Sequence, residues 1–161
     1  MKIWVDNDAC PNVIKETIYK AARRLSLEVY LVANRAGALP KASYIKVVTV
    51  PQGADIADQY IIDKVDKMDV VITADIPLAD AVVTKGSVAI NPRGYLYTEE
   101  NIKERLSTRD LMTTLRNEGT IQGGGPSGFS QKNKENFANT LDRTLTQRHR
   151  LYLANLKKDK A

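Results

Sequence analysis

The sequence predicts an α/β fold in which a mainly parallel sheet of about five strands lies between two layers of helices, with a helical extension at the C-terminus. Two observations support this prediction. Short apolar runs alternate with amphipathic segments over the first 90 residues, a pattern typical of βαβ units. The apolar runs are nearly continuous, as in strands whose two faces are both covered by helices.

The expected elements follow one another without an internal repeat. The strands are short apolar runs at residues 2–6, 27–32, 45–50, 69–73 and 87–90. The helices between them begin near Pro11, Ala54 and Pro77, and proline suits a first helical turn. Beyond Pro92 the pattern is helical only, with one helix or a broken pair over 98–117. A last helix carries Phe137, Leu141, Leu145 and Tyr152 at roughly four-residue spacing.

Charge divides the 161 residues into two parts. We expect an α/β domain over residues 1–118, followed by a glycine-rich loop and a basic helix over 119–161 that packs on or beside it. Residues 101–161 hold 12 Lys and Arg against 6 Asp and Glu, whereas the first 100 residues are nearly neutral. This asymmetry predicts a polyanionic partner. The alternative is a solvated helical face.

Several classes of protein are excluded by composition. A single cysteine and a single histidine rule out a disulfide framework, a cysteine-based zinc site and a His-rich metal centre. No apolar run approaches the roughly 18 residues that would span a membrane, so we expect no membrane partner. The first apolar run is interrupted by an acid, Asp6, after only a few residues, unlike the apolar region of a signal peptide. We therefore expect a cytoplasmic protein.

Aspartates follow two of the expected strands. Asp6 and Asp8 come after the first strand, and Asp75 comes after the fourth. If these strands are neighbours, Asp6 and Asp75 meet at the crevice where a doubly wound sheet binds ligands. Two such carboxylates repel each other unless a cation or a proton lies between them, and Mg²⁺ or Mn²⁺ suits oxygen ligands. The alternative is that both aspartates only cap the following helices.

The helix between these strands adds two acids. Asp58 lies on the same helical stripe as Ile61, Ile62 and Val65, which predicts that it faces the sheet. A carboxylate is costly to bury there unless it is paired or bound to metal. Asp55, three residues earlier, shares its face and could either join the cluster or complement the helix dipole.

Polar residues elsewhere are candidates for substrate binding. Asn7 belongs to the turn after the first strand, and Asn34 and Arg35 follow the second strand, where they could bind phosphate or form an ordinary turn. Ser127 lies in the glycine-rich loop, whose bare amides could hold an anion or simply link two elements. Lys132 and Arg143 follow it and could contact a phosphate backbone.

Four ordered segments together resemble one protein family. They are 5–11 (VDNDACP), 53–58 (GADIAD), 73–79 (TADIPLA) and the late Gly-Gly-Gly-Pro at 123–126. These motifs, spread over nearly the whole chain, resemble the YaiI/YqxD family of bacterial proteins. The resemblance implies a three-layer PIN-like/Rossmann-like domain, and PIN-like domains are metal-dependent ribonucleases. Asp6 and Asp75 match their acids after strands one and four, and Asp55 or Asp58 matches the helical acid, which is often glutamate there.

These observations favour a nuclease or related phosphodiesterase that acts on RNA. Asp6, Asp58 and Asp75 would hold Mg²⁺ or Mn²⁺, with Asp55 and Asp8 assisting, and the metal would activate water. One alternative is a haloacid-dehalogenase-like phosphatase with Asp6 as nucleophile, Asp8 as acid and Thr73 as the phosphate-binding hydroxyl. Another is a non-catalytic RNA-binding module in which the acids are structural caps. The sequence leaves the oligomeric state open.

Overall fold

The computed structural model describes residues 1–35, 40, 42–53, 55–119 and 129–160. Within these residues a six-stranded sheet has the order β3-β2-β1-β4-β5-β6. Its strands are β1 (Lys2–Asp6), β2 (Glu28–Ala33), β3 (Ile45–Thr49), β4 (Val70–Ile72), β5 (Val88–Ile90) and β6 (Leu96–Tyr97). The first five strands are parallel, and β6 runs antiparallel to β5. The strand order reverses between β1 and β4, which are direct neighbours.

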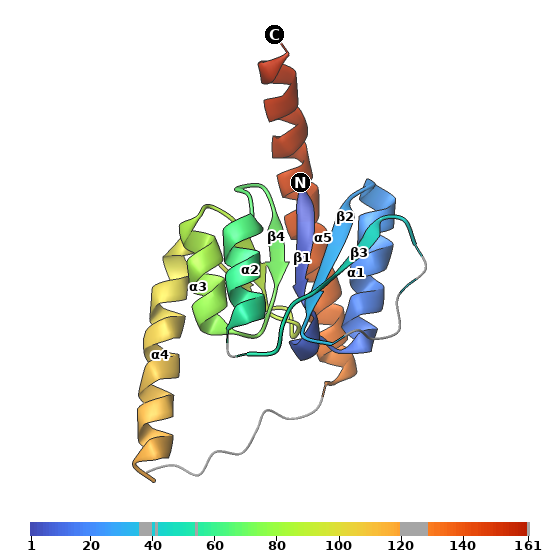
Figure 1. Ribbon diagram of the computed structural model, residues 1–161. Helices are drawn as coiled ribbons and strands as arrows, with labels where there is room; N and C mark the ends of the chain where they lie inside the picture. The colour runs from blue at the N-terminus through green and yellow to red at the C-terminus, as the bar shows by residue number, and fades with distance from the viewer. Residues whose placement is uncertain (36–39, 41, 54, 120–128, 161) are drawn as a thin grey trace.

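Helices cover both faces of the sheet (Figure 1). They are α1 (Asn12–Leu25), α2 (Ile56–Lys64), α3 (Ile76–Thr84), α4 (Glu99–Asn117) and α5 (Gln131–Asp159), with a 3₁₀ turn, η1 (Asn7–Ala9), after β1. Helices α1 and α5 pack on one face. Helices α2 and α3 pack on the other, and α4 lies against α3. The three-layer α/β arrangement expected from the sequence is therefore present.

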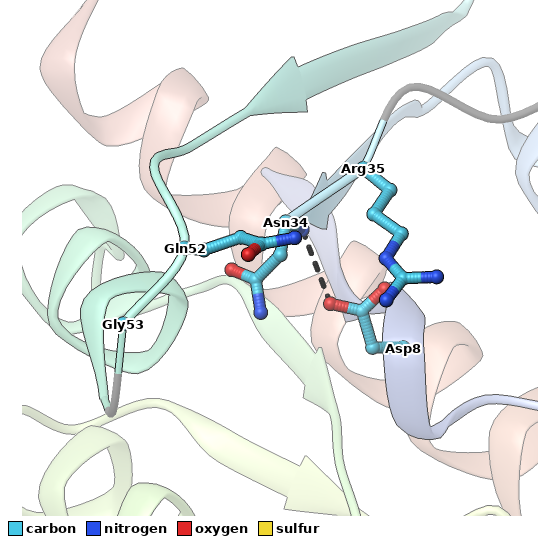
Figure 2. A pocket seen from close by; sticks show the side chains of 5 residues that line it. All are labelled: Asp8, Asn34, Arg35, Gln52 and Gly53. Carbon is cyan, nitrogen blue, oxygen red and sulfur yellow. Dashed lines mark hydrogen bonds between the residues drawn. The ribbon is translucent and has the colours of Figure 1, made fainter.

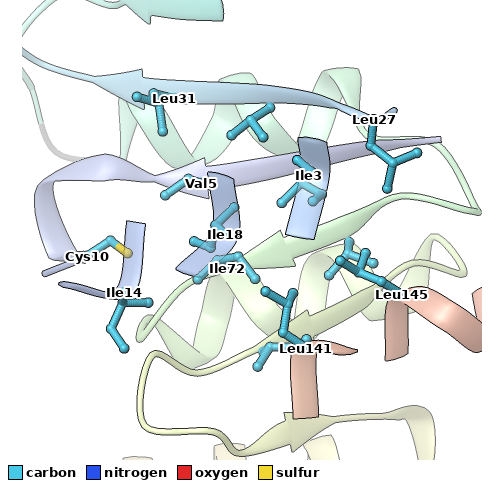
Figure 3. Close-up of a cluster of buried hydrophobic side chains, with 14 of the residues drawn as sticks. Ile3, Val5, Cys10, Ile14, Ile18, Leu27, Leu31, Ile72, Leu141 and Leu145 are labelled. Carbon is cyan, nitrogen blue, oxygen red and sulfur yellow. The ribbon is translucent and has the colours of Figure 1, made fainter. Parts of the chain in front are cut away.

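The side chains of β1 alternate between two cores. Ile3 and Val5 pack with α1 and α5, in the cluster drawn in Figure 3, whereas Trp4 packs on the side of α2 and α3. Because neighbouring residues of a strand point to opposite faces, Asp6 emerges on the side of α2 and α3. The same alternation in β4 places Thr73 on that side, since Val71 lies there and Ile72 does not.

The expectation that only helices follow Pro92 is wrong, because β6 follows β5 after a tight turn. The Gly94 amide donates to the Asn91 carbonyl oxygen at 2.8 Å, and Gly94 adopts φ +98°, a conformation that favours glycine. This turn folds the chain back so that Tyr97 pairs with Ala89. A strand of two residues is too short to show an alternating pattern in the sequence.

Helix α5 begins beside the body of the protein and ends beyond it (Figure 1). Phe137, Leu141 and Leu145 are buried in the core on the α1 side. The Arg148 guanidinium donates to the Gly86 carbonyl oxygen at 3.1 Å, just before the amino end of β5. The residues after Arg148 therefore lie toward the amino edge of the sheet. Of the helices described, none is long and apolar enough to cross a membrane.

Candidate functional site

The carboxyl ends of β1 and β4 meet as the sequence analysis expected. Val5 pairs with Ile72, so Asp6 and Thr73 follow side by side. The Thr73 hydroxyl donates a hydrogen bond to the Asp6 carboxylate at 3.1 Å. Burial raises the pKa of Asp6 above its usual value, the Thr73 hydrogen bond lowers it, and the charges of Asp75 and Asp8 raise it again. Asp6 is thus half-buried in a negatively charged region between the carboxyl ends of β1 and β4, and we refer to this region as the crevice.

Asp75 enters the same crevice as the N-cap of α3. Its carboxylate accepts a hydrogen bond from the Leu78 amide at 2.9 Å, and its own amide donates to the Thr73 hydroxyl at 3.0 Å. The capping role considered in the sequence analysis is therefore correct for Asp75. For Asp6 it is not, because the Asp6 side chain makes no capping hydrogen bond to the 3₁₀ turn that follows.

The third carboxylate is that of Asp58, in the first turn of α2. The helical stripe in the sequence predicted that Asp58 faces the sheet. In the structure its neighbour Ala57 is buried, whereas Asp58 is only half-buried. Its pKa is raised to about 6, first by burial and then by the charges of Asp75, Asp6 and Asp55 and by a side-chain hydrogen bond to Asp75. Carboxylates from β1, α2 and α3 therefore interact in one place.

Asp55 lies at the rim of this group. The helix expected from residue 54 begins at Ile56, and Asp55 precedes it in the left-handed conformation, with φ +64°. Its side chain is exposed and makes no capping hydrogen bond, although its charge contributes to the raised pKa of Asp58. Asp55 can assist the three inner carboxylates but is not enclosed with them.

The acidic side chains in this region are the ones that the sequence analysis expected to hold a metal ion. In the part of the chain that the structure describes, no group of three or more His, Cys, Asp and Glu side chains is already arranged to hold a metal ion. The chemistry of the donors nevertheless fits a hard cation, because carboxylate oxygens are what Mg²⁺ and Mn²⁺ prefer. Burial and, after it, repulsion by Asp75 and Asp6 raise the pKa of Asp58, and a divalent cation would relieve the repulsion.

A second feature of the same edge is a polar cavity of about 550 Å³ formed by the segments after β1, β2 and β3 (Figure 2). Asp8, Asn34, Arg35, Gln52 and Gly53 line it. The backbone amide of Asn34 donates a hydrogen bond to the Asp8 carboxylate at 3.1 Å, and the Arg35 side chain extends toward Asp8. The Asn34 side-chain oxygen is buried and finds no donor within the described chain. This cavity, rather than the group around Asp58, contains Asp8.

The remaining predicted site residues are dispersed. Asn7 is half-buried, and its side-chain oxygen has no donor among the residues described. Lys132 is exposed in the first turn of α5. Arg143 lines a separate cavity of about 390 Å³ next to Arg93. Ser127 lies outside the described residues.

Among the lining residues of these cavities that sequence reasoning missed, two share a recognisable position in the sequence. Gln52 and Arg93 each follow a proline just after a strand, in Pro51-Gln52 and Pro92-Arg93. Both therefore leave the sheet at its carboxyl edge, where ligands of such sheets bind. A search for polar residues in that position would have found them.

The fold and the crevice define a class: a doubly wound α/β protein whose carboxyl edge carries clustered acids at the reversal of strand order. A family model described as "Uncharacterized BCR, YaiI/YqxD family" matches residues 4–147, and the chain belongs to this family. It is 56% identical to a UPF0178 protein of Marinomonas sp. (strain MWYL1) over 148 residues, covering 92% of this chain and 99% of the relative. A UPF0178 protein of Shewanella woodyi is 53% identical over 150 residues, covering 93% and 99%. No solved structure matches the chain.

Proposed function

We propose that this protein is a Mg²⁺- or Mn²⁺-dependent nuclease of the PIN-like type that hydrolyses phosphodiester bonds in RNA. The observation that supports this proposal is the electrostatic coupling of Asp6, Asp58 and Asp75, which come from three different elements and whose charges help to raise the pKa values of Asp6 and Asp58. A divalent ion bound there would lower the pKa of its water and offset charge on the phosphate. The cytoplasmic location expected from the sequence stays a prediction.

Each residue of the crevice has a distinct part in this proposal. Thr73 fixes the orientation of Asp6 through its hydroxyl hydrogen bond, and Leu78 does the same for Asp75 through its amide. Asp58, whose carboxylate is half-buried next to Asp75 and Asp6, would join these two aspartates in holding the ion. Asp55 and Asp8 add negative charge from the rim.

The polar cavity beside the crevice is a suitable place for the nucleotide next to the cleaved bond. Arg35 supplies a cation for a phosphate group, and the amides of Asn34 and Gln52 can pair with the edge of an unstacked base (Figure 2). In this proposal Lys132, exposed in the first turn of α5, contacts the backbone further along.

Cleavage of a labelled single-stranded RNA with and without Mn²⁺ tests the proposal. Asp6→Asn should abolish metal-dependent cleavage and leave the melting temperature nearly unchanged, since the amide oxygen can still accept from Thr73. Asp63→Asn is the matched control, because Asp63 is an exposed acid that accepts a hydrogen bond from Gln59 on the outer side of α2. If Asp6→Asn cleaves as fast as the wild type, the assignment of the site is wrong.

Two alternatives become outcomes of such tests. A phosphatase with Asp6 as nucleophile needs the Thr73 hydroxyl for a substrate phosphate, whereas that hydroxyl donates to Asp6 and accepts from the Asp75 amide. Trapping a phosphorylated Asp6 would favour the phosphatase. A non-catalytic RNA-binding module would bind RNA without metal, and calorimetry would then detect no stoichiometric uptake of Mn²⁺.

A further inference from the structure

We propose that the cavity between the β5–β6 turn and α5 binds a backbone phosphate of the RNA, and that Arg143 is its principal ligand. The identity of the ligand rests on the function proposed above. The cavity has a volume of about 390 Å³ and lies between Arg93 and Tyr95 of the turn and Asn136, Asn139 and Arg143 of α5. We call it the Arg143 cavity.

The Arg143 cavity is cationic. None of the described residues that line it is acidic, although two are arginines. The acids nearest to it along α5 are engaged elsewhere, since Glu135 accepts from Gln131 and Asp142 pairs with Arg24 of α1. Arg143 is exposed and makes no hydrogen bond or ion pair with any residue that the structure describes. A guanidinium in this state is available to an incoming phosphate, which it can bind through two parallel hydrogen bonds.

The walls of the Arg143 cavity are held in place without a ligand. The Thr140 hydroxyl donates to the Gly94 carbonyl oxygen at 2.8 Å, which joins α5 to the turn. The Arg93 amide donates to the Asn91 side chain at 2.8 Å, and its guanidinium lies 4.5 Å from the centre of the Phe129 ring. Such a preformed site loses little conformational entropy on binding.

The Arg143 cavity lies at the same edge of the sheet as the carboxylates. The Thr73 amide donates to the Ile90 carbonyl oxygen at 3.1 Å, and the turn that carries Arg93 starts at the next residue, Asn91. An RNA strand that crosses this edge from the side of α2 and α3 reaches the cavity after passing the end of β5. By contrast, Arg148 bonds to Gly86 near the amino end of β5, so Arg150 lies away from this path.

A pair of charge-matched variants on one helix tests this placement. Binding of a short fluorescent oligouridylate is measured in EDTA, so that no cleavage occurs, at several salt concentrations. Arg143→Gln should weaken binding about tenfold, the effect of losing one charge-assisted hydrogen-bonded contact. It should also make the slope of log K against log salt shallower by about 0.7, the value for one phosphate contact on a single strand. Arg150→Gln removes the same charge and should change neither quantity.

The outcomes separate this inference from the proposed nuclease. Equal weakening by Arg143→Gln and Arg150→Gln, or no effect of either, overturns the phosphate site, because only overall charge would then matter. The same conclusion follows if the wild type does not bind the oligouridylate. If Arg143→Gln alone weakens binding while the wild type cleaves no RNA with Mn²⁺, the phosphate site stands and the nuclease is refuted. Arg143→Lys, which keeps the charge, should preserve the salt slope and lose affinity.

Discussion

Replacing Asp58 by asparagine should stabilise the protein at neutral and alkaline pH. The wild-type carboxyl has a pKa of about 6 instead of 3.8, because burial and the charges of Asp75 and Asp6 oppose its ionisation. Near pH 8, well above this pKa, the folded protein carries nearly all of this unfavourable charge. The side-chain amide of the Asp58→Asn variant does not ionise, so the repulsion is removed.

The size and sign of the effect follow from the same pKa. Because the pKa is raised on folding, the folded state binds more protons than the unfolded state between about pH 4 and 6, and the wild-type stability falls over that range. Asp58 is only half-buried, so solvent screening reduces the penalty to about 1 kcal/mol. In a chain of this size that corresponds to a rise in melting temperature of about 2–4 °C.

Thermal or urea unfolding in EDTA at two pH values measures this prediction. Near pH 8 Asp58→Asn should be the more stable protein, and near pH 4 the two should be alike. Asp63→Asn is the control on the same helix and should show no such dependence. Adding Mn²⁺ at about 100 times its Kd should stabilise the wild type by about 2.7 kcal/mol and the variant by much less. A variant that is less stable than the wild type near pH 8 in EDTA would refute the reasoning.

Three further predictions concern the frame around the site. Gly94→Ala should lower the free energy of unfolding by about 3 kcal/mol, because a Cβ at φ +98° would lie 2.7 Å from the Asn136 carbonyl carbon. An unchanged midpoint of urea unfolding would contradict this. Asp69→Asn should lower the free energy of unfolding by about 2–3 kcal/mol, since the buried carboxylate accepts hydrogen bonds from three N–H groups, including the Trp4 indole at 2.9 Å. Urea unfolding followed by tryptophan fluorescence measures this loss. Asp75→Ala should lower the free energy of unfolding by about 1 kcal/mol, whereas Asp75→Asn should keep the helix cap and this stability. Both variants should lose RNA cleavage. Equal stability of the two variants would argue against the cap.

The parallel core could be predicted because its central strands are short, continuous apolar runs. Residues 3–5 and 70–72 have no polar interruption, and a parallel sheet covered on both faces requires that pattern. The meeting of Asp6 with the residues after β4 followed from the usual order of such sheets. The strand β6 could not be predicted, since its two residues depend on a turn set by Gly94.

The chemical state of the acids could not be predicted from spacing alone. The helical stripe indicated that Asp58 faces the sheet, but only the packing of α2 shows that it is half-exposed and bonded to Asp75. Likewise, Asp8 and Asp6 are two residues apart, yet Asp8 turns toward Asn34. The 3₁₀ turn after β1 separates their directions, and no residue pattern in this segment indicates such a turn.

The hydroxyl of Thr73 gives the crevice a direction. A backbone amide can only donate, so the contact from the Asp75 amide must use a lone pair of the hydroxyl, and its single hydrogen is left for Asp6. The Asp6 oxygen that faces Thr73 is thereby an acceptor. The hydrogen bonds therefore run in one sense across the sheet edge, from the start of α3 through the Thr73 hydroxyl to the end of β1.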